Sequence, residues 1–451
     1  MLKIVALPIG DFIFSIFALY IGFLTRVHSI TKADMIIDIT GAKLFVFGSI
    51  LIFSSFMIDM YNREKNGGKK DLFLRVCMNI FVTLIVLSLV FYIAPHFFLG
   101  RGFLAVSLVS FGVLQFLWHS SYRAFACPGL ARNVLILGSG PLAQKIGEIV
   151  RKSNHRYVFA GHISLPSEQL CLPMFDLSVN GDTLEDTVKK EKAHKIIVSL
   201  SERRGVFPMK DILACKFKGV EVVDAPSFYE EMTGKLLIED ITPSWFIFSN
   251  GFRITPIKCF GKRIIDILFA LGGLIFLLVS FPIIAVAIKI NSSGPIFYKQ
   301  LRVGVREKTF ALYKFRTMYS NSEEKSGAVW AQPKDPRITV VGKLLRKTRI
   351  DEFPQFLNVL RGDMSIVGPR PERPEFVQGL NILIPYYSER HSVKPGITGW
   401  AQINYPYGSS VKDALEKLRY DLYYIKHFSL FLDIIVILDT IKMLLFGRGP
   451  R

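Results

Sequence analysis

Four long apolar stretches open this 451-residue chain and limit what it can fold into. They lie near residues 4–24, 43–60, 73–95 and 102–122. As helices rising about 1.5 Å per residue, stretches of about 18–23 residues can cross a hydrocarbon core about 30 Å thick. No small-residue cleavage site follows the first stretch, so we expect a membrane span there rather than a cleavable signal. The sequence therefore predicts a multi-pass membrane protein.

The distribution of lysine and arginine predicts the orientation of these spans, because cytoplasmic loops carry an excess of both. The turn between the third and fourth stretches has only Arg101, whereas the loop between the second and third is rich in basic residues: Arg63, Lys65, Lys69, Lys70 and Arg75. We therefore expect the N-terminus and everything after residue 123 in the cytosol. Asp11 and Asp59, near span ends, are expected to be interfacial or paired with other helices.

Composition supports a membrane protein and adds a charge asymmetry. Half of the residues are hydrophobic and 21% are charged, which excludes a disordered chain. Residues 251–451 contain 30 Lys and Arg against 16 Asp and Glu, so most of the formal net charge of +19 lies there. Such a region suits anionic lipid or phosphorylated substrates. We predict no nucleic-acid partner, because no recognised nucleic-acid module is present. Five scattered cysteines without a CxxC pair argue against disulfides and structural zinc.

A fifth apolar run at residues 264–288 is long enough to span, yet basic residues flank both of its ends. A crossing helix would place one of these flanks outside the cell. Pro282 lies inside the run, where it removes a backbone donor and bends a helix. A re-entrant helix that enters and leaves on the cytosolic face satisfies both observations. An ordinary kinked span is the alternative.

Strands and helices are expected to alternate between residues 129 and 250. Predicted strands at 133–138, 157–163, 195–200 and 220–223 favour a doubly wound, Rossmann-like α/β domain. The turn Gly138-Ser139-Gly140 could hold a dinucleotide pyrophosphate at a helix N-terminus. The acidic ribose ligand expected about 20 residues later is missing. A nucleotide site and a scaffold or sensor that kept the fold are both consistent with this pattern.

The C-terminal region has two adjacent carboxylates, Asp351 and Glu352, among many cations. The cations lie just upstream or farther along the chain: Lys343, Arg346, Lys347, Arg349, Lys314, Arg316 and Arg370. Arginine matches phosphate oxygens bidentately, and a carboxylate in positive surroundings can attack phosphorus or hold Mg²⁺. The alternatives are a solvated helix start for the carboxylates and a lipid-binding surface for the cations.

This string of motifs resembles the bacterial sugar transferases, the monotopic phosphoglycosyl transferases that start glycan assembly on polyprenyl phosphate. The resemblance covers about 258–451 and is most specific at 351–372 and 395–402. The preceding spans and α/β domain resemble the long members, the polyprenyl glycosylphosphotransferases of exopolysaccharide biosynthesis. The resemblance implies transfer of a sugar 1-phosphate from a UDP-sugar to undecaprenyl phosphate, releasing UMP. It also implies the cytosolic face of the bacterial inner membrane, and a homodimer is plausible for long members.

The resemblance further implies roles for individual residues. Asp351 would be the nucleophile on the β-phosphorus, giving a covalent phosphosugar-aspartate intermediate. Glu352 would hold Mg²⁺ bridging the diphosphate. The substrate-binding residues would be Lys314 and Arg316 on phosphate oxygens, Pro369, Arg370 and Pro371 around the nucleotide, and Asp421 supporting the site.

Two apolar segments of the C-terminal region, 264–288 and 428–446, are expected to contact the membrane in different ways. The family commonly breaks its re-entrant helix at a Ser-Pro pair, but here Phe281 precedes Pro282 and Ser280 lies one residue earlier. The angle of the break is therefore not predicted. The last apolar segment, 428–446, carries recurring polar residues, so an interfacial amphipathic helix is expected rather than a sixth span.

The sequence thus predicts three parts. Residues 1–128 form four transmembrane helices, 129–250 the Rossmann-like domain, and 251–451 a mixed α/β phosphoglycosyl transferase domain with the re-entrant helix at 264–288. The alternative is a nucleotide-sensing membrane regulator with a degenerate transferase domain, and the intact Asp351 and Glu352 argue against it.

Overall fold

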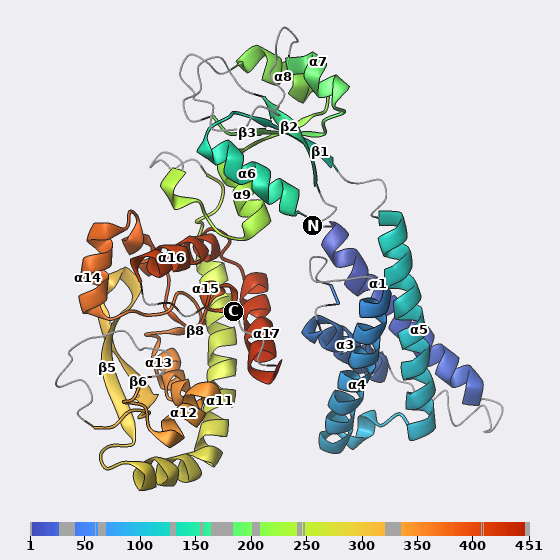
Figure 1. Ribbon diagram of the computed structural model, residues 1–451. Helices are drawn as coiled ribbons and strands as arrows, with labels where there is room; N and C mark the ends of the chain where they lie inside the picture. The colour runs from blue at the N-terminus through green and yellow to red at the C-terminus, as the bar shows by residue number, and fades with distance from the viewer. Residues whose placement is uncertain are drawn as a thin grey trace. The chain divides into compact units, whose positions relative to one another are not determined.

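Figure 1 shows a computed structural model of the chain. It describes residues 2–26, 41–58, 60–61, 69–126, 132–153, 157–163, 184–200, 208–240, 246, 249–320, 335–406, 408 and 410–446. The chain divides into two compact units, Met1–Val222 and Val223–Arg451. The predicted division at residues 128 and 250 stays a prediction.

Four helices pack together in the first unit: α1 (Leu2–Arg26), α3 (Gly41–Met57), α4 (Lys69–Ile93) and α5 (Arg101–Ala126). A 3₁₀ turn, η1 (Pro95–Phe97), follows α4. Stretches within α1, α4 and α5 are long and apolar enough to cross a membrane, whereas α3 is apolar but has 17 residues. Residues 62–68, which include Arg63 and Lys65 of the basic loop, lie outside the described residues, as does Asp59, so the predicted orientation and the expectation for Asp59 stay predictions.

A polar network links all four helices of this bundle. The fully buried Asp11 of α1 accepts hydrogen bonds from Tyr61 (2.8 Å) and Gln115 (2.8 Å), and His119 Nε2 lies 3.1 Å from its Oδ1. Asn79 of α4 donates to Gln115 (3.0 Å) and to a serine of α3 (2.8 Å). The prediction that Asp11 pairs with other helices is therefore confirmed.

The rest of the first unit is an α/β domain, whose last strand extends two residues past Val222. Its strands are β1 (Arg132–Leu137), β2 (Tyr157–Ile163), β3 (Lys195–Val198) and β4 (Glu221–Asp224), in the order β2-β1-β3-β4, with β1 parallel to both neighbours. The helices are α6 (Pro141–Lys152), α7 (Leu184–Lys190) and α8 (Met209–Phe217). The predicted strands and the parallel sheet are confirmed. At the glycine turn Gly138 has φ +129°, and a Cβ there would stand 2.5 Å from the Ser199 carbonyl oxygen, so only glycine fits.

The second unit mixes helices with short sheets. Strands β5 (Phe297–Val303) and β6 (Thr309–Phe315) form an antiparallel pair, and β7 (Ser365–Val367) and β8 (Gly396–Thr398) form a parallel pair. The remaining elements are α9 (Ala225–Thr233), η2 (Ile238–Asp240), α11 (Pro256–Asn291), η3 (Val305–Glu307), α12 (Val340–Lys347), η4 (Ile350–Glu352), α13 (Gln355–Arg361), α14 (Pro374–Leu383), η5 (Tyr387–Ser392), α15 (Trp400–Asn404), α16 (Val411–Lys426) and α17 (Leu430–Phe446).

Helix α11 is the longest element of the chain and is long and apolar enough to cross a membrane. In Figure 1 it runs along the unit and then turns sharply toward its C-terminal end. Pro282 lies within it, and proline bends a helix because it has no backbone N–H. On its inner side Gly273 lies against Phe356 of α13, while Ile284 and Ile288 pack against Phe315 of β6. Most other apolar side chains of α11 are exposed.

Helix α17 places its polar residues inward. Asp433 is buried and pairs with Lys262 of α11 (2.8 Å), while Phe431 and Ile434 are exposed. The recurring polar residues therefore bind α17 to the unit, and the surface it presents is apolar. The expectation of an interfacial helix rather than a sixth span stays a prediction.

Candidate active site

A sharp turn after α12 carries Asp351 and Glu352 into the interior of the second unit. Thr339 begins α12 by accepting a hydrogen bond from the Gly342 N–H (2.9 Å). After α12, Arg349 has φ +57°, a left-handed conformation that costs a non-glycine residue about 1 kcal/mol. The short η4 follows directly, and its two carboxylates are only 8% and 6% exposed.

Glu352 is surrounded by cations. Its Oε1 accepts hydrogen bonds from Lys314 Nζ (3.1 Å) and from Arg370 (2.9 Å), and Arg349 lies 3.7 Å from Oε2. Burial opposes ionisation, but the charges of these three groups outweigh it and hold the pKa of Glu352 well below its usual range. Glu352 is therefore a permanent carboxylate anion, although it is almost fully buried.

Asp351 has a different environment. Its carboxylate makes no hydrogen bond or ion pair with any residue that the structure describes. Burial and the negative charge of Glu352 raise the pKa of Asp351 to about 6, while Lys314, Arg346 and Arg370 limit the rise. At neutral pH Asp351 is thus mainly ionised, and its oxygens are not engaged by neighbours. These are the properties that a carboxylate nucleophile needs.

Arg370 reaches Glu352 from a rigid segment, residues 369–372. Pro369 and Pro371 fix φ on either side of Arg370. The backbone carbonyls of both prolines accept hydrogen bonds: the Gly396 N–H donates to Pro369 (2.9 Å), and Arg302 donates to Pro371 (3.1 Å). The predicted Pro-Arg-Pro motif therefore presents one guanidinium to the carboxylate pair.

Asp421 supports this segment through an intermediary. It is buried on α16 and accepts a hydrogen bond from Arg390 (2.7 Å), which also donates to the Arg370 carbonyl (3.0 Å). Burial raises the pKa of Asp421 to about 6, and Arg390 opposes that rise. The structure thus connects Asp421 to the backbone of Arg370 and not directly to Asp351 or Glu352.

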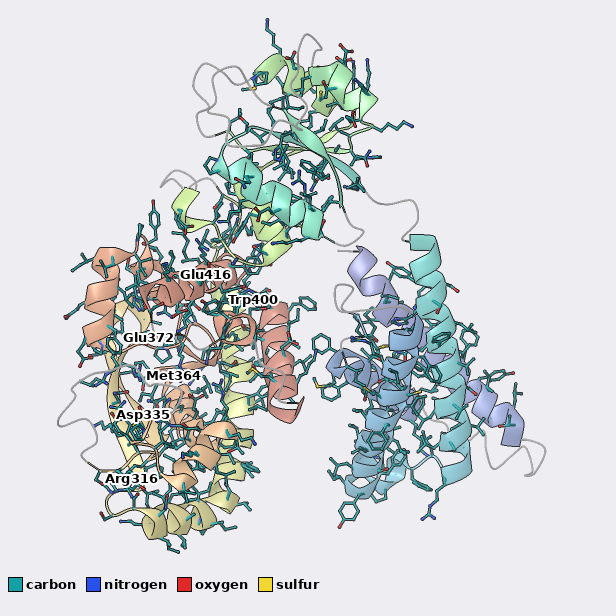
Figure 2. The ribbon with its side chains drawn as sticks, in the orientation of Figure 1. Arg316, Asp335, Met364, Glu372, Trp400 and Glu416 are labelled. Atoms are coloured by element: carbon teal, nitrogen blue, oxygen red, sulfur yellow. The ribbon has the colours of Figure 1, made fainter. Side chains whose placement is uncertain are left out.

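Arg316 is not part of this cluster. Its guanidinium donates to the carbonyls of Ser292 (2.6 Å) and Ser293 (2.7 Å), directly after the C-terminal end of α11. Figure 2 shows Arg316 well away from Glu372, which follows the Pro-Arg-Pro motif. The predicted phosphate contact of Arg316 stays a prediction: its guanidinium contacts these carbonyls, whereas Lys314, two residues earlier, contacts Glu352.

The glycines of the motif at 395–402 have a packing role. A Cβ on Gly396 would stand 2.1 Å from the Gly368 nitrogen, and a Cβ on Gly368 would stand 2.3 Å from the Lys394 carbonyl oxygen. Only glycine permits two backbones to approach so closely. The motif therefore joins β8 to the loop after β7 and fixes the start of the 369–372 segment.

Two carboxylates, Asp351 and Glu352, are available to a divalent cation at this site. Within the described residues, no three His, Cys, Asp or Glu side chains gather in a metal-binding cluster. Mg²⁺ is commonly held by one or two carboxylates together with substrate phosphates and water. Glu352 suits this arrangement, because its Oε2 has only the longer contact with Arg349.

Sequence reasoning missed Arg390. It lies 20 residues from Arg370 and 31 from Asp421, and the fold brings these two partners to it. No local spacing or motif marks it. Arg349 was visible as one of the upstream cations, but its contact with Glu352 depends on the left-handed turn before η4.

The chain matches the family model described as "Bacterial sugar transferase" over residues 257–447. It is 42% identical over 237 residues to the UDP-N-acetylgalactosamine-undecaprenyl-phosphate N-acetylgalactosaminephosphotransferase of Aeromonas hydrophila, covering 52% of this chain and 55% of that protein. It is 32% identical over 331 residues to the undecaprenyl-phosphate glucose phosphotransferase of Komagataeibacter xylinus, covering 71% and 60%.

A shorter relative is matched over nearly its whole length. The exopolysaccharide production protein PSS of Rhizobium leguminosarum bv. phaseoli is 40% identical over 194 residues, which are 42% of this chain and 97% of that protein. The matches to the two longer relatives span only 55% and 60% of their lengths. The residues that the family model matches, 257–447, contain the carboxylate pair and its cations.

Proposed function

Because this chain belongs to the bacterial sugar transferase family, we propose that it transfers a sugar 1-phosphate from a UDP-sugar to undecaprenyl phosphate and releases UMP. The observation that carries the proposal is the pairing of an unengaged, ionised Asp351 with a Glu352 held among three cations. In this role the enzyme performs the first membrane step of exopolysaccharide assembly.

The first half-reaction uses Asp351 as the nucleophile. A carboxylate oxygen attacks the β-phosphorus of the donor, the bond from that phosphorus to the bridging oxygen breaks, and UMP leaves with the electron pair. The product is a phosphosugar joined to Asp351. Lys314 and Arg370 lie beside the neighbouring carboxylate and stabilise the charge that develops on the departing phosphate. No proton is needed from the protein in this step.

In the second half-reaction Asp351 is the leaving group. A phosphate oxygen of undecaprenyl phosphate attacks the same phosphorus, the bond to Asp351 breaks, and the carboxylate is regenerated. The lipid product is a polyprenyl diphosphate sugar. A covalent intermediate lets one set of cations serve two different anions in turn, so the site never has to hold both substrates.

Glu352 would hold Mg²⁺ together with the donor diphosphate. When bound, the cation would neutralise negative charge on the donor diphosphate and act as a Lewis acid toward the leaving group. Lys314 and Arg370 keep Glu352 ionised, and this is the state in which it can serve as a ligand.

The proposal places the site on the cytosolic face of the inner membrane, with α11 as a re-entrant anchor. The bend in α11, its exposed apolar side chains and the basic residues at both of its ends support this topology. The apolar outer surface of α17 and the excess of lysine and arginine suit contact with anionic lipid.

The chemistry is tested by UMP release without acceptor. Purified protein mixed with Mg²⁺ and a panel of UDP-sugars should release about one UMP per polypeptide, since only the first half-reaction can occur. Mass spectrometry should find the phosphosugar on Asp351. Asp351→Asn should abolish both signals, whereas Asp363→Asn, a matched change at a half-buried aspartate, should keep them. An adduct on another residue, or an undiminished burst from Asp351→Asn, would reject the proposal.

The topology is tested by labelling single cysteines in a chain whose five native cysteines are replaced. Ile254→Cys and Lys299→Cys stand before and after the α11 region, and both should react only from the cytosolic side. His96→Cys, in the turn between α4 and α5, should react from outside and serves as the control. Labelling of Lys299→Cys from outside would show that α11 crosses the membrane.

A further inference from the structure

The 369–372 segment cannot be fixed by a backbone N–H hydrogen bond at every residue. Proline has no backbone N–H, so two of the three residues in the Pro-Arg-Pro motif can be fixed only through their carbonyl groups. A segment that must place one guanidinium accurately therefore depends on donors that come to it from elsewhere in the fold.

Each of the four carbonyls in this segment has such a donor. The two outer carbonyls, of Pro369 and Glu372, accept from the backbone N–H groups of Gly396 and Val303 (2.9 Å each). The two inner carbonyls accept from guanidinium groups, Arg390 on Arg370 (3.0 Å) and Arg302 on Pro371 (3.1 Å). Two arginine side chains thus hold the backbone carbonyls of Arg370 and Pro371.

Arg390 makes this contact from a buried position. It is 3% exposed, and its two terminal nitrogens bind three groups: the Tyr387 hydroxyl (2.6 Å), Asp421 (2.7 Å) and the Arg370 carbonyl. Asp421 balances its charge, because an unpaired buried guanidinium would be strongly destabilising. The planar fork of arginine reaches all three acceptors at once, which a lysine ammonium cannot do.

We propose that Arg390 is a positioning residue for the sugar-nucleotide donor. By holding the Arg370 carbonyl it fixes the Arg370 side chain against Glu352, and so aligns the cation that meets the donor phosphates. This inference rests on the proposed transfer reaction. Arg390 itself contacts neither substrate, and its effect passes entirely through Arg370.

The first test is Arg390→Lys, measured by the donor concentration that gives half-maximal UMP release and by the KM for undecaprenyl phosphate. We expect the donor value to rise about tenfold, with the acceptor KM unchanged. Arg419→Lys is the matched control. Like Arg390, Arg419 is buried and paired with carboxylates, but it lies on α16 and its partners are Glu239 and Glu416. It should lower the melting temperature without changing the donor value.

A double-mutant cycle separates positioning from simple loss of stability. Because Arg390 acts through Arg370, Arg390→Lys combined with Arg370→Lys should be no more than about twofold worse than Arg370→Lys alone. Fully multiplicative effects would overturn the proposal. So would an Arg390→Lys variant that loses thermal stability but keeps the wild-type donor value.

A second variant tests the inference even if Arg390→Lys does not fold. Asp421→Asn keeps the guanidinium but loosens its hold, and we expect a rise of about threefold in the donor value with the acceptor KM unchanged. An unchanged donor value in this folded variant would also overturn the inference. If the wild-type protein releases no UMP from any UDP-sugar, the transfer reaction itself is wrong, which is distinct from a failure of Arg390 alone.

Discussion

Asp11 in the helix bundle and Glu352 in the second unit are both buried carboxylates with three side-chain partners, but the partners differ in charge. Tyr61 and Gln115 donate to Asp11 as neutral groups, and His119 is charged only when it is protonated. The partners of Glu352 are Lys314, Arg349 and Arg370, which each carry a positive charge. Two of the three partners of Asp11 are thus neutral donors, whereas all three partners of Glu352 are cations.

This difference decides what each site can do. Around Asp11 the donors satisfy the carboxylate and leave it fully buried, so the network joins helices and has little charge to offer a ligand. Around Asp351 and Glu352, four cations face two carboxylates, since Arg346 also acts on Asp351. The surplus positive charge is left for an anionic substrate, and a diphosphate is suited to balance it.

Among the changes that test this difference between the two environments, the largest effect is expected from Glu352→Gln. The substitution keeps an acceptor oxygen for Lys314 and Arg370 but removes the charge, so UMP release should fall about 10³-fold while the protein stays folded. The measurement is the rate of the UMP burst, together with the melting temperature. Glu375→Gln, at an exposed glutamate of α14, should retain wild-type rates. A fast Glu352→Gln enzyme would mean that the charge of this carboxylate is not needed for chemistry.

A smaller effect should separate Lys314 from Arg316. The resemblance to the sugar transferases predicts that both residues bind phosphate oxygens. Lys314→Gln should reduce the use of donor about tenfold, because it removes a cation that contacts Glu352. Arg316→Gln should lower the melting temperature instead, because the carbonyls of Ser292 and Ser293 lose their donor. Steady-state kinetics with varied UDP-sugar, beside thermal unfolding, gives both values. Equal kinetic losses would place Arg316 in the substrate site after all.

The sequence predicts most of the fold for identifiable physical reasons. Long apolar runs have few alternatives to membrane helices, and buried parallel strands are continuous apolar segments, so α1, α4, α5 and β1–β4 lie close to their expected positions. The inward direction of Asp433 on α17 could not be predicted. It depends on Lys262, which is 171 residues away and has no signature in the local pattern.

The active site is predictable to the extent that its residues are neighbours in the sequence. Asp351, Glu352 and the Pro-Arg-Pro motif are local, and the structure brings Lys314 and Arg370 to Glu352 as expected. Arg316 shares the motif of Lys314 but binds the segment after α11, and Arg390 joins the site only through distant contacts. Residue type and spacing thus identify the chemistry, whereas the supporting hydrogen bonds depend on the fold.

The smallest expected effect tests the other carboxylate. Asp11→Asn keeps one acceptor oxygen but turns an amide N–H₂ toward groups that now donate to Asp11, so the bundle should lose about 1–2 kcal/mol of stability. Thermal unfolding of the protein in lipid nanodiscs, followed by circular dichroism, measures the loss, and the UMP burst should be unchanged. Ser88→Ala is the control, since Ser88 is exposed and bonds only within α4 (2.8 Å to the Leu84 carbonyl). If Asp11→Asn instead abolished the burst while the protein remained folded, the network around Asp11 would have a part in the reaction, and the functional distinction between the two buried carboxylates would fail.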